Sequence, residues 1–230
     1  MPISPQSSPI LLSHAVMGGL TPLIPLPLVD DLFYGYFLRS MAKKLADSHQ
    51  KTLSSDEIKV LTAQKRRGCA LGCLGTVLLY PLKKILRKIF FILEWKRAAD
   101  TIGRTYYFGF LLHEALQAGW VEKHSATRVR TAMDAVLART NTSFVSRAAL
   151  GVMNGSKGSI QSWAARLLGS TPRGAGEREV AQAAQNAGDN DLSAIFSQLQ
   201  AAINGLPSEH FENLTRELQR ELELPPLNPI

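Results

Sequence analysis

The chain has 230 residues, of which 45% are hydrophobic and 20% are charged. This length and apolar content exclude a disordered protein and suffice for one large domain, or for a domain with an appendage. The net charge of +7 is uneven: it is −1 over residues 1–42, +13 over 43–170 and −5 over 171–230. A basic middle predicts an anionic partner surface, which can be acidic lipid head groups, nucleic acid or the acidic last third of the same chain.

The N-terminal part predicts two helices joined by a proline-rich turn. The first is expected over Ser8–Leu20, and prolines at 22, 25 and 27 argue against a straight membrane span in the uncharged stretch 10–29. Asp30 is expected to cap a second helix that runs from Leu32 to about Ala46. One apolar stripe at spacings of three and four marks that helix: Leu32, Phe33, Tyr36, Phe37, Met41 and Leu45.

Residues 18–46, GGLTPLIPLPLVDDLFYGYFLRSMAKKLA, combine a small-residue and proline turn, an aspartate and an amphipathic helix. This stretch resembles bacterial EcsC-like proteins and the helical domains beside some membrane GTPases, families whose function is unknown. The resemblance implies a bacterial protein that associates with a membrane, and it implies no reaction. Unlike the GTPase-linked proteins, the chain contains no phosphate-binding loop motif.

An uncharged apolar run, Gly68–Leu82, follows a short helix that a Ser54–Glu57 capping box predicts. As a helix the run would span about 22 Å, which is short of the roughly 30 Å of a bilayer core. Because basic clusters flank it on both sides, we expect it to re-enter, half-insert or lie on one membrane face. The alternative is a buried helix of a soluble bundle. Its two cysteines, Cys69 and Cys73, predict buried or lipid-facing thiols, with acylation or redox chemistry as alternatives.

The segment after this run predicts a cationic amphipathic helix. On a helical wheel from residue 83, basic residues occupy one side and isoleucines and leucines the other. Phe91 and Trp95 fall among the cations, where aromatic rings suit head-group anchoring. The residues expected to contact an anionic membrane are Lys65, Arg66, Arg67, Lys83, Lys84, Arg87, Lys88, Phe91 and Trp95.

The rest of the chain predicts further helices. A long aromatic-rich helix is expected over about 82–118, with Gly103 and Gly109 as weak points, and Ser125 is expected to cap the next one. Residues 169–179 are rich in glycine and predict a linker to two acidic helices, 192–204 and 209–224. The last helix carries a narrow apolar stripe that suits partner docking or self-association better than a buried core: Phe211, Leu214, Leu218 and Leu222.

Enzyme motifs are absent from the sequence. The five histidines, His14, His49, His113, His124 and His210, show no paired metal-ligand spacing, and the chain has neither HExxH nor GxSxG. We therefore expect no catalytic residues, no metal and no cofactor. Nucleic-acid binding is disfavoured because the basic residues alternate with leucine, isoleucine and phenylalanine at helical spacing rather than lining a polar groove.

These patterns together predict an all-α protein, an irregular multi-helix bundle with apolar hairpin-like segments. Its expected parts are a basic, membrane-associating domain over 1–168, a linker over 169–179 and a small acidic helical module with an extended tail over 180–230. The expected function is that of a non-enzymatic peripheral or monotopic adaptor or scaffold. The start of the chain has no basic region typical of a secretory signal, so we expect the protein at the cytoplasmic face of a membrane. The alternative is a soluble all-α protein-binding module whose apolar segments form its core.

Overall fold

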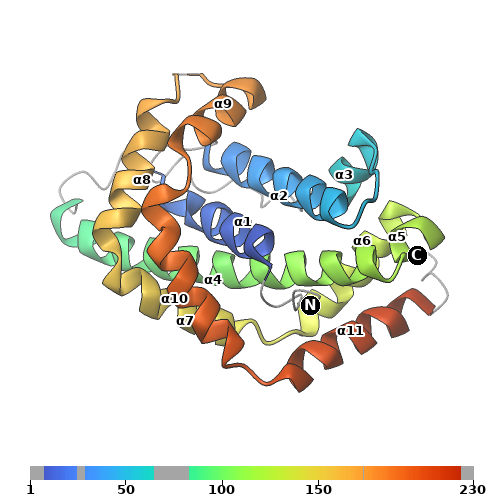
Figure 1. Cartoon of the computed structure of the whole chain (residues 1–230). Coiled ribbons are helices and arrows are strands. Elements are labelled where there is room, and N and C mark those ends of the chain that lie inside the picture. Colours follow the sequence, from blue (N-terminus) through green and yellow to red (C-terminus); the bar gives the residue numbers. More distant parts are fainter. Residues whose placement is uncertain (1–7, 25–28, 65–82, 173, 224–230) are drawn as a thin grey trace.

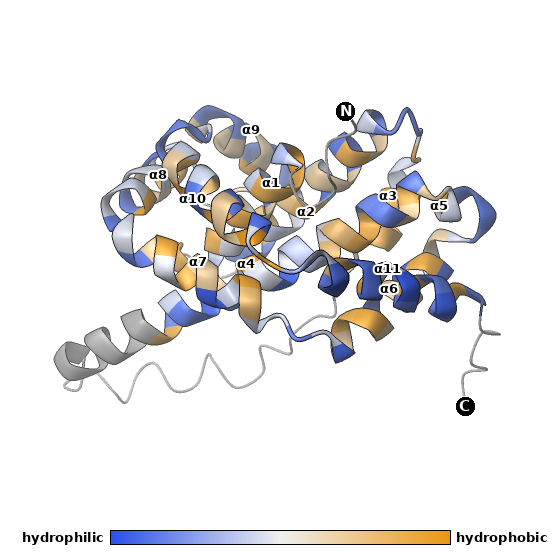
Figure 2. Ribbon diagram, turned by 60° about the horizontal axis from the view of Figure 1, so that its bottom comes forward, coloured by the Kyte–Doolittle hydropathy of each residue, from blue (hydrophilic) through white to orange (hydrophobic). Residues whose placement is uncertain are grey.

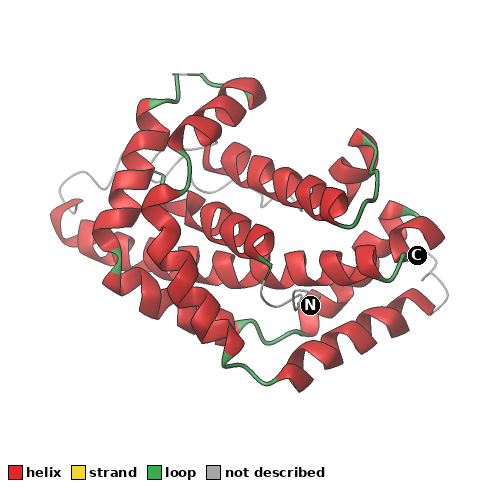
Figure 3. Cartoon of the chain, in the orientation of Figure 1, coloured by secondary structure: helices red, strands yellow, loops and turns green. Residues whose placement is uncertain are grey.

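The computed structural model describes residues 8–24, 29–64, 83–172 and 174–223, and of residues 83–92 it describes the backbone only. Every regular element in these ranges is helical (Figure 3), so the all-α prediction is confirmed. The α-helices are α1 (Pro9–Leu20), α2 (Val29–Ser48), α3 (Ser55–Leu61), α4 (Lys83–Gln117), α5 (Trp120–Lys123), α6 (Ala126–Arg139), α7 (Ser143–Gly155), α8 (Lys157–Gly169), α9 (Glu177–Ala187), α10 (Ser193–Asn204) and α11 (Ser208–Glu223). Two short 3₁₀ turns, η2 (Thr21–Leu23) and η4 (Asn190–Leu192), follow α1 and precede α10.

Helix α4 is the axis of the bundle, with α1 and α7 packed along it (Figure 1). The backbones approach closely at three glycines. A Cβ on Gly19 would lie 2.2 Å from Cγ1 of Ile102, one on Gly103 would lie 2.4 Å from Oγ of Ser146, and one on Gly109 would lie 2.9 Å from Sδ of Met41. Gly103 and Gly109, expected as weak points of the long helix, are therefore the places where α7 and α2 pack against it.

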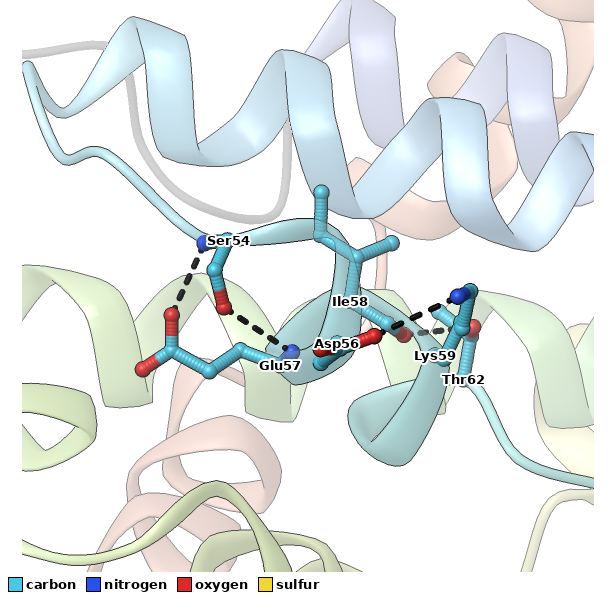
Figure 4. A network of polar contacts seen from close by, with 6 residues as sticks. All are labelled: Ser54, Asp56, Glu57, Ile58, Lys59 and Thr62. Atoms are coloured by element: carbon cyan, nitrogen blue, oxygen red, sulfur yellow. Dashed lines mark hydrogen bonds and ion pairs between the residues drawn. The ribbon is translucent and has the colours of Figure 1, made fainter.

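The capping box predicted at Ser54 is confirmed (Figure 4). The Ser54 N–H donates to Glu57 Oε2 at 2.8 Å, and the Glu57 N–H donates to Ser54 Oγ at 3.2 Å. These two bonds satisfy donors that a helix start otherwise leaves free. Asp30 is not the cap of α2, since that helix begins at Val29 and includes Asp30 in its first turn.

The acidic C-terminal helices share one core with the basic helices before them. Helix α9 packs against α2 and α8, α10 against α7, and α11 against α6 (Figure 1). Hydrophilic residues dominate α11, whose apolar residues appear as isolated bands (Figure 2). Three ion pairs join the acidic segment to the body: Arg39–Glu177 at 3.4 Å, Arg166–Asp191 at 2.7 Å and Arg139–Glu221 at 2.5 Å.

Candidate functional site at the start of helix α4

Most of the expected membrane-contact residues fall where the structure describes no side chains. Lys65, Arg66 and Arg67 lie outside the described residues, as does the apolar run 68–82 with its two cysteines. Lys83, Lys84, Arg87, Lys88 and Phe91 belong to the first turns of α4, whose backbone is helical. The structure thus has a helix where one was predicted, as the beginning of the longest helix among the described residues (Figure 1).

The burial of Trp95 contradicts the prediction that this residue anchors to lipid head groups. Only 6% of its surface is exposed, and its indole N–H donates to Oδ1 of Asn154 at 3.0 Å. A buried indole needs such an acceptor, and Asn154 on α7 supplies it. Trp95 therefore ties the start of α4 to α7 and faces the core, not the surrounding solvent.

Leu93, two positions before Trp95, lies on the other side of the helix. Its exposed fraction is 56%, the largest among the described large apolar side chains, followed by 41% for Phe144. Lys96 and Arg97, one turn further along α4, are exposed, and Arg97 pairs with Glu94 at 3.5 Å. Leu93 therefore lies beside two exposed cations on the surface of α4.

Helical register connects Leu93 to the turns that precede it. Leu86, Ile89 and Phe90 stand seven, four and three positions before Leu93, spacings that place residues on one side of a helix. Lys84 and Lys88 stand eleven and seven positions before Trp95, spacings that share the register of Trp95 and not that of Leu93. The apolar residues before Leu93 therefore share its helical register, whereas Trp95 has another register. The change takes place within one turn of α4.

The structure also contradicts the prediction that the apolar stripe of α11 is a docking surface. Phe211, Leu214, Leu218 and Leu222 are all buried within the chain, at exposed fractions of 5% or less. The Phe211 ring lies 5.1 Å from that of Phe110 and 6.3 Å from that of Tyr107. A helix that packs on the body through one side needs only one apolar stripe. The narrow pattern of α11 therefore marks a core contact and not a free surface.

Histidines that are scattered in the sequence meet in the structure. Nε2 of His49 lies 3.1 Å from Nδ1 of His113, which stands 64 residues away in the chain. Burial lowers the pKa of both rings, that of His113 to about 4, so both are neutral at pH 7 and one N–H donates to the other ring. His210 bonds the Tyr107 hydroxyl at 2.9 Å. Spacing along the chain carried no signal for either contact.

No metal-ligand cluster forms within the described ranges. Three or more potential metal-ligand side chains do not gather there. Asp100 and Arg104 are exposed, whereas Glu114 is half-buried, accepts from Thr215 Oγ1 at 3.0 Å and has a pKa raised by burial. None of the helices in those ranges is both long enough and apolar enough to cross a membrane.

These observations define an all-α multi-helix bundle whose most exposed described leucine lies at the start of its central helix. Comparison of the chain with family models, curated proteins and solved structures finds no match. The resemblance of residues 18–46 to EcsC-like proteins therefore stays a prediction.

Proposed function

We propose that the protein is a non-enzymatic peripheral or monotopic adaptor, bound to the anionic cytoplasmic face of a membrane through the start of α4 and the apolar run before it. Leu93 carries the proposal, because it is exposed at the end of the apolar side of a cationic helix. The lipid-facing side would consist of Leu86, Ile89, Phe90 and Leu93.

The contact of α4 with α7 supports this orientation. Since Trp95 and Asn154 join the two helices on the core side, the Leu93 side of the same turn is directed away from the body. Lys157 follows Asn154 by three residues and is exposed at the start of α8. It adds a positive charge at the end of the bundle where α4 begins, and each cation near an anionic surface contributes about 1 kcal/mol to binding.

The adaptor role rests on the distance between this site and the acidic surface of α11. His210 on α11 bonds the hydroxyl of Tyr107, which stands 14 residues beyond Leu93 on the same helix. At 1.5 Å per residue this separation is about 20 Å. The exposed carboxylates Glu209 and Glu212 on α11 would therefore remain available to a basic partner while α4 is on the membrane.

The alternative is a soluble all-α protein-binding module, and the shared core of the described helices supports it. In that case residues 65–82 of the same chain would complete the bundle and cover Leu93. Vesicle binding separates the two functions, because only the first requires the Leu93 side of α4 to reach lipid.

Leu93→Gln is the test variant, and Phe144→Gln, at the other exposed large apolar residue of the described ranges, is its matched control. In co-sedimentation with phosphatidylglycerol vesicles, we expect Leu93→Gln to bind more weakly by about ten- to hundredfold, since burying a leucine contributes about 1.5–3 kcal/mol. Phe144→Gln should bind like the unmodified chain. Equal binding of all three chains would contradict the proposed lipid contact.

A second variant tests the electrostatic part. Replacing Lys83, Lys84, Arg87 and Lys88 with glutamine should weaken binding and flatten its dependence on salt, because salt screens exposed charge. The comparison uses anionic and neutral vesicles at two salt concentrations. If the variant binds anionic vesicles as tightly as the unmodified chain does, the basic residues have no part in binding.

A further inference from the structure

A groove of about 510 Å³ opens between α1, α2 and α10, away from the start of α4. One part of its lining is apolar, from Ile10, Leu12 and Phe196, and another is polar, from Lys44, Asp189 and Gln200. A volume of this size lies within the range of small-molecule sites, which combine an apolar surface with a few polar groups that fix orientation.

His14 forms a fixed part of the groove wall. It is buried, its Nδ1 lies 2.8 Å from the Ile10 carbonyl oxygen, and its Nε2 lies 3.1 Å from Oγ of Ser40. Since a carbonyl can only accept, we assign the proton to Nδ1, and Nε2 then accepts from the Ser40 hydroxyl. Both ring nitrogens are used inside the fold, so His14 shapes the groove and leaves ligand recognition to its neighbours.

Two opposite charges line the groove without pairing. Lys44 comes from α2 and Asp189 from the turn before α10, and both are exposed. Both line the same groove as His14. Within the described part of the chain neither forms an ion pair, whereas Asp191, two residues on, pairs with Arg166 at 2.7 Å.

We propose that the groove binds a small zwitterion with an apolar group, namely a free α-amino acid with an apolar side chain. Its carboxylate would pair with Lys44 and its ammonium group with Asp189, and its side chain would pack on Ile10 and Phe196. A zwitterion supplies both missing counter-charges in one molecule, which a simple anion or cation does not. This inference is independent of the proposed membrane contact.

L-phenylalanine and L-leucine are the probes, and amide chemical shifts of the full-length chain are the measurement. We expect either amino acid to shift the amides of Ile10, Phe196 and Gln200. N-acetyl-L-phenylalanine lacks the ammonium group and L-phenylalaninamide lacks the carboxylate, so each should bind about tenfold more weakly.

Lys44→Gln and Asp189→Asn should each weaken binding of L-phenylalanine by about tenfold. Lys44→Arg keeps the positive charge and should bind L-phenylalanine as the unmodified chain does. Lys43→Gln, the neighbouring exposed lysine outside the groove lining, is the matched control and should bind normally. Unperturbed circular dichroism shows that the variants are folded. Absence of shifts in groove amides with both amino acids, or equal affinity of the two charge variants and the control, would overturn the assignment.

Discussion

Two adjacent glycines in α1 have different surroundings and predict opposite effects of the same substitution. A Cβ on Gly18 would meet Tyr34 Cδ2 at 3.4 Å and Phe37 Cβ at 3.5 Å, which are ordinary contacts. A Cβ on Gly19 would lie 2.2 Å from Cγ1 of Ile102 and 2.6 Å from its Cα and N. Because two of these atoms are backbone, a side-chain rotation cannot relieve the overlap, and α1 must move away from α4.

The magnitudes follow from two opposing effects. Alanine in place of glycine in a helix interior stabilises by about 1 kcal/mol, whereas overpacking a filled core costs about 1–3 kcal/mol and occasionally more. We therefore expect Gly18→Ala to stabilise the fold by about 0.5–1 kcal/mol. Gly19→Ala should destabilise it by about 2 kcal/mol or more, since the displaced helix also loses contacts along its length.

Urea unfolding followed by circular dichroism measures both variants against the unmodified chain, and a change of midpoint at constant slope reports the change in stability. Gly151→Ala is a further control, because a Cβ there meets nothing within 4 Å. If Gly19→Ala matches Gly18→Ala in midpoint, the close crossing of α1 and α4 at Ile102 is wrong.

Three other outcomes follow from single residues. Leu218→Ala should destabilise the fold by about 2–5 kcal/mol in urea unfolding, because its side chain is buried, and an effect below about 0.5 kcal/mol would restore the surface-docking interpretation of α11. Burial, aided by the Lys44 charge, lowers the pKa of His14 from 6.5 to about 4, so the unfolded chain takes up a proton first and stability falls as pH drops below 6.5. Between pH 7 and pH 5 this loss is about 2 kcal/mol, and His14→Gln should show a correspondingly flatter dependence on pH. Ser54→Ala should destabilise α3 by about 1 kcal/mol, visible as faster amide hydrogen exchange in that helix, and unchanged exchange would contradict the role of the capping box.

Local signals in the sequence predicted much of the helical structure. The Ser54–Glu57 box and the Ser125 cap depend on residues three positions apart, and both form as expected. The apolar stripe of α2 correctly marked Phe33, Phe37, Met41 and Leu45 as buried. Helices α7, α8 and α9 were not predicted separately, since many of their buried positions hold alanine and only single large residues such as Trp163 stand out.

Contacts between distant residues were not predictable. Trp95 stands among cations on a helical wheel, and only the position of Asn154 on α7 shows that it faces the core. The groove charges Lys44 and Asp189 are 145 positions apart in the chain, and no motif connects them. A periodic pattern identifies which residues share a side of a helix, but the partner that covers this side depends on how the helices assemble.

The distribution of charge in the fold bears on how the acidic last third can affect the basic middle. Its Glu177, Glu221 and Asp191 pair with Arg39, Arg139 and Arg166, so three of its carboxylates lie against particular arginines of the body. The contact between α11 and α4 nearest to Leu93 is at Tyr107, about 20 Å along the helix, which is more than twice the screening length of about 8 Å at physiological salt. The acidic residues of α11 therefore leave the field at the start of α4 nearly unchanged. Truncation after Leu168 would remove buried residues of the shared core together with the acidic charge, so a change in vesicle binding by such a fragment would report on the loss of the fold as much as on the loss of charge.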